Sequence, residues 1–138
     1  MTVHHLRRVA FVTLASFLVP HFAASQDYQG KIQCAALSSG VGQLATKASV
    51  KVQGATASYE RPIIGLDGSS VLGQETGTGS VSPDGTIVLR GGASTSLSTF
   101  TATYSGRITG RRVELFGTQN HTTPRKFDRS CSISADQK

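Results

Sequence analysis

The sequence lacks most of the residues from which catalytic and metal sites are built. It contains no tryptophan, one methionine, two cysteines and four histidines, and three of those histidines lie within the first 21 residues. A catalytic triad in the rest of the chain could use only His121, and a zinc site needs more ligands than one histidine and a pair of cysteines supply. No Gly-x-Ser-x-Gly motif occurs either. We therefore expect a protein that is not an enzyme and that holds no metal or other cofactor.

Three glutamates leave one catalytic alternative open. Glu60, Glu75 and Glu114 could converge as a carboxylate pair of the kind that hydrolyses glycosidic bonds. Nothing in their spacing favours that arrangement. His121 lies in a polar, basic stretch of the sequence, and we expect it to be a surface-loop residue without a catalytic role.

The longest apolar run lies at the N-terminus. Arg7 and Arg8 precede the 11-residue run 9–19 (VAFVTLASFLV), and small residues follow at Ala23 and Ser25. This order is typical of a secretory signal peptide, and the run is too short for a membrane-spanning helix, which needs about 20 residues. We expect a signal peptide at 1–25, a single domain at 26–138 without a transmembrane segment, and a secreted or periplasmic protein.

The remainder of the chain has the periodicity of β-strands. No stretch shows a sustained 3.6-residue apolar period, whereas 99–108 alternates between polar residues and apolar or small ones. The turn sequences Ser-Pro-Asp-Gly at 82–85 and Thr-Gly-Arg-Arg at 109–112 each separate two alternating segments, which indicates two hairpins in succession. We predict an all-β fold, a single small antiparallel meander barrel of about eight strands.

The two cysteines lie close to the two ends of the predicted domain. Cys34 belongs to its first strand and Cys131 to its last. In an exported protein such a pair is expected to form a disulfide, and no Cys-x-x-Cys motif supports the alternative of two redox-active thiols. The bridge would place the first and last strands side by side. That arrangement favours a closed or nearly closed barrel over a two-sheet sandwich, because closure removes exposed strand edges.

Two segments are expected to be loops. The segment 61–73 (RPIIGLDGSSVLG) combines turn residues with the apolar side chains Ile63, Ile64 and Leu66. It would either plug one end of the core or form an apolar contact surface, and we favour the plug. The segment 118–129 is polar and basic throughout.

Basic residues are concentrated in the second half of the chain. Strand parity places Arg90, Arg107 and Arg112 on the outer face, where they could form one ridge facing an anion such as lipopolysaccharide, an acidic glycan or nucleic acid. We favour the alternative of a solvated face with ordinary ion pairs. Nucleic acid is disfavoured because no aromatic residues are interleaved to stack on bases.

The order of these motifs resembles a group of known proteins. The chain has Tyr-x-Gly-x-Ile-x-Cys at 28–34, a Pro-Asp-Gly hairpin, Tyr-Ser-Gly-x-Ile-x-Gly at 104–110 and a C-terminal cysteine. It resembles small secreted β-rich proteins of Gram-negative bacteria with no assigned function, and the resemblance implies a periplasmic or extracellular barrel and no activity.

Two classes of function remain open on the sequence alone. The first is a non-catalytic binding or envelope-associated module whose partner is a protein or an anionic envelope component. The second is a barrel-type carrier of a small apolar ligand, held in a cavity under the apolar loop. A packed interior would favour the first class, and a deep apolar hollow would favour the second.

Overall fold

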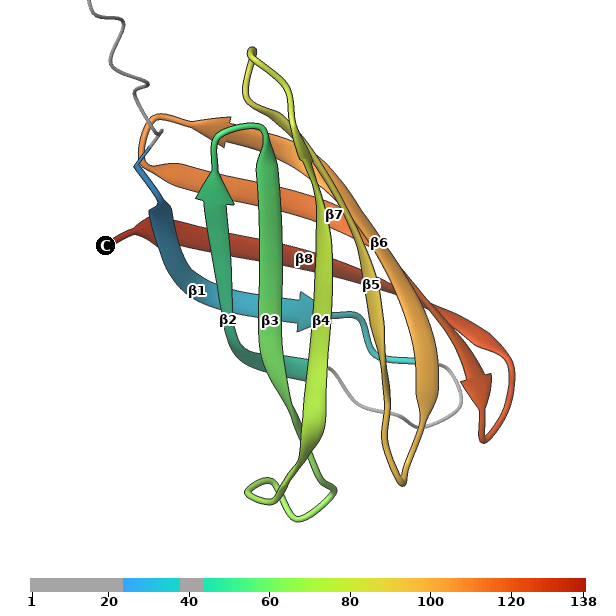
Figure 1. Ribbon diagram of the computed structural model, residues 1–138. Helices are drawn as coiled ribbons and strands as arrows, with labels where there is room; N and C mark the ends of the chain where they lie inside the picture. The colour runs from blue at the N-terminus through green and yellow to red at the C-terminus, as the bar shows by residue number, and fades with distance from the viewer. Residues whose placement is uncertain (1–23, 38–43) are drawn as a thin grey trace, which may run out of the picture.

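The computed structural model describes residues 24–37 and 44–138, which form a closed barrel of eight antiparallel strands (Figure 1). Each strand pairs with the next along the chain, and the last pairs with the first, so the predicted meander barrel is confirmed. Residues 1–23, which hold most of the predicted signal peptide, and 38–43 lie outside the described residues. The strands are β1 (Gln26–Cys34), β2 (Leu44–Gln53), β3 (Thr56–Ile64), β4 (Val71–Val81), β5 (Thr86–Ser94), β6 (Thr99–Thr109), β7 (Arg112–Thr123) and β8 (Phe127–Gln137).

Alternation along the strands decides which side chains fill the barrel. Successive residues point to opposite faces, and the buried apolar side chains occupy inward positions. The middle of the barrel is filled by large side chains that are almost completely buried, each of which contributes roughly 1.5–3 kcal/mol of hydrophobic stabilisation. These are Ile32, Leu89, Tyr104, Leu115 and Ile133. The middle of the interior is therefore a packed core.

The barrel is closed by pairing between β1 and β8. Their ladder runs from Tyr28 opposite Gln137 to Cys34 opposite Cys131. A disulfide joins the two cysteines at the end of that ladder, as predicted. The first and last strands of the domain are thus held together by hydrogen bonds and by a covalent bond.

Both predicted loop segments are largely strand, and these predictions were wrong. β3 continues to Ile64 and β4 begins at Val71, so only 65–70 is irregular within 61–73. β7 likewise continues to Thr123 and β8 begins at Phe127. In both regions polar side chains occupy inward positions, so the apolar alternation that marks a strand is missing from the sequence.

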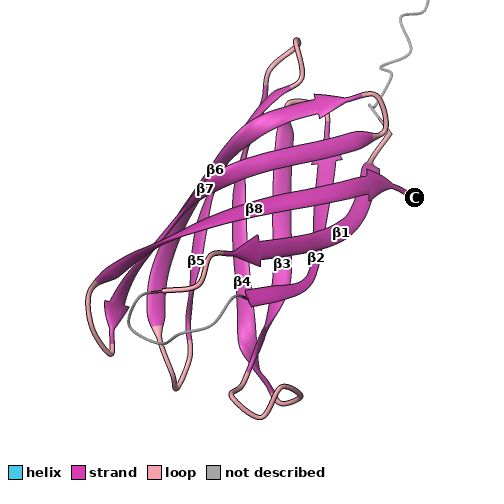
Figure 2. Ribbon diagram, turned by 180° about the vertical axis from the view of Figure 1, so that it is seen from behind, coloured by secondary structure: helices cyan, strands magenta, loops and turns pink. Residues whose placement is uncertain are grey.

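The two ends of the barrel differ. Connections 65–70, 95–98 and 124–126 lie at one end, which we call the loop end, together with the end of β1 and the start of β2. The tight turns after β2, β4 and β6 lie at the other end, where the C-terminus also emerges (Figure 2). The loop end thus carries the longer connections, and the opposite end carries the tight turns and the C-terminus.

The wall of the barrel has a gap between β2 and β3 near the loop end. β1 pairs with β2 along its whole length, but β3 pairs with β2 only from Gln53 opposite Thr56 to Ser49 opposite Glu60. Figure 1 shows the first part of β2 running at a steep angle to β3. In an antiparallel sheet, every second residue of a strand directs its N–H toward the same neighbouring strand. Thr56 faces β2 at the hairpin, so Pro62, six residues further on, also faces β2, and its nitrogen has no hydrogen to donate. We call this gap the β2–β3 seam.

Removal of the disulfide should weaken the barrel substantially. The bridge joins residues 97 positions apart, and a constraint of that length removes much conformational entropy from the unfolded chain. Replacing Cys34 and Cys131 together by Ser should lower the free energy of unfolding by about 2–5 kcal/mol, measured by urea titration. A double variant with an unchanged urea midpoint, or reactive thiols in the native protein, would contradict this.

Candidate functional site

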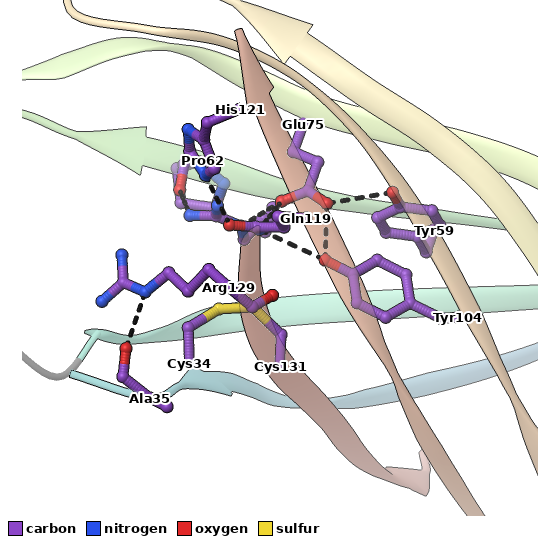
Figure 3. Close-up of a disulfide and its surroundings, with 11 residues drawn as sticks. Cys34, Ala35, Tyr59, Pro62, Glu75, Tyr104, Gln119, His121, Arg129 and Cys131 are labelled. Atoms are coloured by element: carbon purple, nitrogen blue, oxygen red, sulfur yellow. Dashed lines mark hydrogen bonds and ion pairs between the residues drawn. A yellow bond between two sulfur atoms is a disulfide. The ribbon is translucent and has the colours of Figure 1, made fainter. Parts of the chain in front are cut away.

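Polar side chains replace the apolar core toward the loop end of the barrel. Five buried residues from β3, β4, β6 and β7 meet there, and we call them the Glu75 cluster (Figure 3). Glu75 is fully buried and Arg61 is 3% exposed, although charged side chains are almost never fully buried unless they are paired. The members are Tyr59, Arg61, Glu75, Tyr104 and Gln119.

The carboxylate of Glu75 accepts four hydrogen bonds. Its Oε1 accepts from the hydroxyls of Tyr59 at 3.0 Å and Tyr104 at 2.8 Å. Its Oε2 accepts from Nε of Arg61 at 2.6 Å and from Nε2 of Gln119 at 3.0 Å. A carboxylate offers about four acceptor positions, so this one is saturated. The four donors come from three strands, and β4 supplies the acceptor.

The two tyrosines are held as hydroxyl donors. Burial, and then the negative charge of Glu75, raise the pKa of Tyr59 and of Tyr104 far above the usual value. Their rings meet edge to face with centroids 5.3 Å apart. Tyr59 fits because the opposite residue is Gly77, where a Cβ would lie 2.2 Å from its ring. The cluster is therefore a tightly packed network in which both tyrosines keep their protons.

His121 extends the network toward the loop end. Its ring is stacked between Phe100 and Phe127, with centroids 4.6 Å and 4.2 Å away, and its Nε2 lies 3.3 Å from Oε1 of Gln119. Because the Gln119 amide nitrogen donates to Glu75, the oxygen faces His121, and Nε2 must carry the proton. Nδ1 is then an acceptor, and it is buried without a hydrogen-bond partner.

The expectation that His121 is a surface-loop residue was wrong. It lies on β7 and is 8% exposed. Burial, and then the positive charge of Arg129, lower the pKa of its imidazole. Sequence reasoning also missed the inward positions of Gln119 and Arg129. Strand parity could have found them, because Gln119 and His121 continue the inward positions of Val113 and the residues that alternate after it.

The interior carries more positive than negative charge. It contains the guanidinium groups of Arg61 and Arg129 but only the carboxylate of Glu75. Nε of Arg129 donates to the backbone oxygen of Ala35 at 2.9 Å, and burial lowers the pKa of its guanidinium. All other acidic side chains of the described chain are exposed: Asp27, Glu60, Asp67, Asp84, Glu114, Asp128 and Asp136.

The three glutamates that the sequence left open as a carboxylate pair do not come together. Glu75 points into the barrel, whereas Glu60 and Glu114 are exposed on its outer face, so the three glutamates do not converge. Within the part of the chain that the structure describes, no group of three or more His, Cys, Asp or Glu side chains could hold a metal ion. No helix in that part is long and apolar enough to cross a membrane.

A second candidate site lies on the outer face of the barrel. An open groove of about 680 Å³ crosses β1 to β5, and we call it the outer groove. Its lining follows two rows of outward residues that are opposite one another in the strand register. The first row is Asp27, Lys51, Ser58, Thr78 and Arg90, and the second is Gln29, Ser49, Glu60 and Thr76.

The apolar segment 61–73 is divided between the interior and the surface. Ile63 is buried in the core, and Ile64 is half-buried. Leu66 lies in the turn and is 95% exposed. Ile63 and the partly buried Leu72 are therefore in a position to plug the end of the core, whereas Leu66 and the exposed Val71 are available for contact.

The three outward arginines do not form one ridge. Arg107 lies 3.7 Å from Asp84, and Arg112 lies 2.9 Å from Glu114 and 3.3 Å from Asp136. Arg90 lines the outer groove, four residues beyond Thr86, the residue opposite Arg107, which corresponds to roughly 13 Å along the strand. Arg107 and Arg112 thus make ordinary exposed ion pairs.

The Glu75 cluster should be necessary for stability. Glu75→Gln leaves the buried guanidinium of Arg61 without its counter-ion, and we expect a loss of about 3–5 kcal/mol in the free energy of unfolding. The matched control is Glu60→Gln, because Glu60 is exposed nearby on the outer face, and it should change stability by less than about 0.5 kcal/mol. Equal urea midpoints for the two variants would contradict a structural role for the cluster.

His121 should make stability depend on pH. Its pKa in the folded state is lowered from 6.5, so the unfolded state binds more protons as the pH falls. The free energy of unfolding should therefore be highest above about pH 7 and decrease as the pH falls toward 5. His121→Phe, which preserves the aromatic stack, should remove this decrease. An unchanged pH profile in that variant would show that other groups cause it.

Comparison with known proteins identifies no relative. No protein-family model, curated protein or solved structure matches the chain. The resemblance to small secreted β-rich proteins of Gram-negative bacteria thus stays a prediction. The function has to be argued from the geometry of the barrel itself.

Proposed function

We propose that the mature chain is an exported, non-catalytic binding module that holds a glycan chain in the outer groove. The observation that carries this proposal is the groove itself, about 680 Å³ in volume and lined by one row of polar side chains across five strands and a second row across four. The predicted leader at 1–25 and the disulfide, a bond that persists in oxidising compartments, support a secreted or periplasmic location.

The packing of the barrel favours its outer face as the binding surface. Leu89, Leu115 and Ile133 fill the middle of the interior, and the saturated carboxylate of Glu75 occupies the region toward the loop end. A carrier of a small apolar ligand needs a largely preformed apolar cavity. This packing supports the binding module over the carrier, because the interior offers side chains and charges where the carrier needs free apolar space.

The chemistry of the outer groove favours a glycan over other chains. Sugars present many hydroxyls that both donate and accept hydrogen bonds, and Ser58, Thr76 and Thr78 present matching hydroxyls between charged neighbours. Recognition of an extended peptide commonly uses a free sheet edge or apolar pockets, and most of this barrel's edges are paired. Nucleic acid would require exposed aromatic side chains for stacking, and the groove is lined by none.

The positions of the acidic residues support a binding role without catalysis. Hydrolysis of a glycosidic bond uses two carboxyl groups on either side of the bond. Glu60 lines the outer groove, but Glu75 lies on the other side of the barrel wall. Asp27 is the other acidic residue of the groove, and it lies two strands away from Glu60 and in the other row.

Blocking the groove tests this proposal. Thr78 lies between Ser58 and Arg90 in the first row, and Thr78→Trp would fill the centre of the groove. We expect the native protein to bind soluble oligosaccharides in calorimetric titrations with maltooligosaccharides and oligogalacturonate. Thr78→Trp should weaken that binding by at least about tenfold, because the indole excludes the chain.

The matched control is Thr101→Trp. Thr101 is also an exposed, outward threonine, but it lies on β6 outside the groove. Its affinity for the same oligosaccharides should equal that of the native protein. The proposal is wrong if neither oligosaccharide binds the native protein, or if the two tryptophan variants bind equally well.

A further inference from the structure

The outer groove continues into a smaller pocket at the β2–β3 seam. This pocket has a volume of about 230 Å³, and we call it the seam pocket. Three of its lining residues, Gln29, Ser49 and Glu60, also line the outer groove. The others are Lys47, Ala48, Arg61, Pro62 and Gln74. A ligand lying in the groove could therefore extend one group into the wall of the barrel.

The seam pocket exists because β2 and β3 stop pairing at that point. Their ladder ends with Ser49 opposite Glu60, and Pro62 offers no N–H to continue it. Lys47 and Ala48 on one side and Arg61 and Pro62 on the other are thus left without cross-strand partners between β2 and β3.

Arg61 lines this pocket, and its guanidinium has hydrogen-bond donors that the Glu75 cluster does not use. A guanidinium has five N–H donors in a planar fork. Nε of Arg61 donates to Glu75 at 2.6 Å, and Nη1 makes a long contact of 3.4 Å with the backbone oxygen of Pro62. No hydrogen bond of Nη2 occurs in the described structure. The Arg61 side chain is nonetheless 97% buried, so the network around Glu75 holds its remaining N–H donors in a fixed position.

The charges around the seam pocket favour an anion. Glu75 offsets the charge of Arg61, but the guanidinium of Arg129 adds a second positive charge inside the barrel. The ammonium group of Lys47 is exposed at the mouth, where Glu60 is the only acidic lining residue. In a region of low dielectric constant, the interior excess of positive charge acts strongly on a group that enters the wall.

We propose that the seam pocket binds a carboxylate group of the ligand, which makes the ligand of the outer groove an acidic glycan built from uronic acids. A carboxylate can accept two parallel hydrogen bonds from the planar fork of a guanidinium. The pocket is large enough for a carboxylate, since one water occupies about 30 Å³ in the liquid. This inference rests on the proposed function for the glycan, but the carboxylate site can be tested without one.

Sodium acetate is the probe, and His121 is the reporter. His121 is the only histidine of the chain after residue 25, so its NMR resonances need no assignment within the mature protein. The positive charge of Arg61 contributes to lowering the pKa of His121. Acetate bound at Arg61 should offset that charge and raise the pKa by roughly 0.3–1 unit, saturably, relative to chloride at equal ionic strength.

Two variants locate the acetate without disturbing the Glu75 cluster. Ser49→Trp would close the mouth of the seam pocket and should abolish the shift, and Lys47→Gln should weaken acetate binding about threefold. The matched control is Lys51→Gln, because Lys51 is exposed on the same strand and lines the outer groove but not the seam pocket. It should leave the acetate response unchanged.

The outcomes separate this inference from the proposed function. No acetate-dependent shift, an equal shift in Ser49→Trp, or a larger shift with inorganic phosphate would overturn the carboxylate site, even if neutral oligosaccharides bind the groove. An acetate response in a protein that binds no oligosaccharide would leave the carboxylate site standing and reject the glycan. Stronger binding of oligogalacturonate than of maltooligosaccharides, with the difference lost in Ser49→Trp, would support both the carboxylate site and the glycan-binding function.

Discussion

The structure depends on one buried carboxylate. Removing Glu75 from water carries a desolvation penalty of several kcal/mol, and only a complete set of donors offsets it. Those donors are side chains of β3, β6 and β7, so all three strands must take their observed register before the carboxylate is satisfied. A shift of one residue in any of them would turn its donor outward. Hydrophobic burial favours a compact barrel, and this network selects one particular barrel.

The same network also leaves little of the interior free for a ligand. It fixes the amide of Gln119, and the amide fixes the proton on His121. Most polar side chains of the interior toward the loop end therefore already make internal hydrogen bonds, and the middle is filled by aliphatic side chains. The outer faces of β1 to β5 hold short hydroxyl side chains in the two rows that line the outer groove.

The sequence predicts the parts of this fold that depend on local signals. Turn residues and apolar alternation indicate the two central hairpins, and the cysteine positions indicate how the barrel closes. Those signals fail around Arg61 and Gln119, because the inward side chains there are polar and the sequence therefore has the composition of a loop. The outer groove could not be predicted from the sequence, for another reason. Thr78 and Asp27 share a row only through the register of four strands, and no local pattern records that register.

Arg61 and Pro62 connect the interior with the surface. Arg61 turns one edge of its guanidinium to Glu75, which stabilises the fold, and leaves other donors unused. Pro62 ends the pairing of β3 with β2, and so leaves the wall open beside those donors. A residue with an N–H at position 62 could extend the ladder and close the wall. Two successive residues thus affect both the stability of the fold and the access to the seam pocket. Arg61 completes the core and also lines the opening that Pro62 creates.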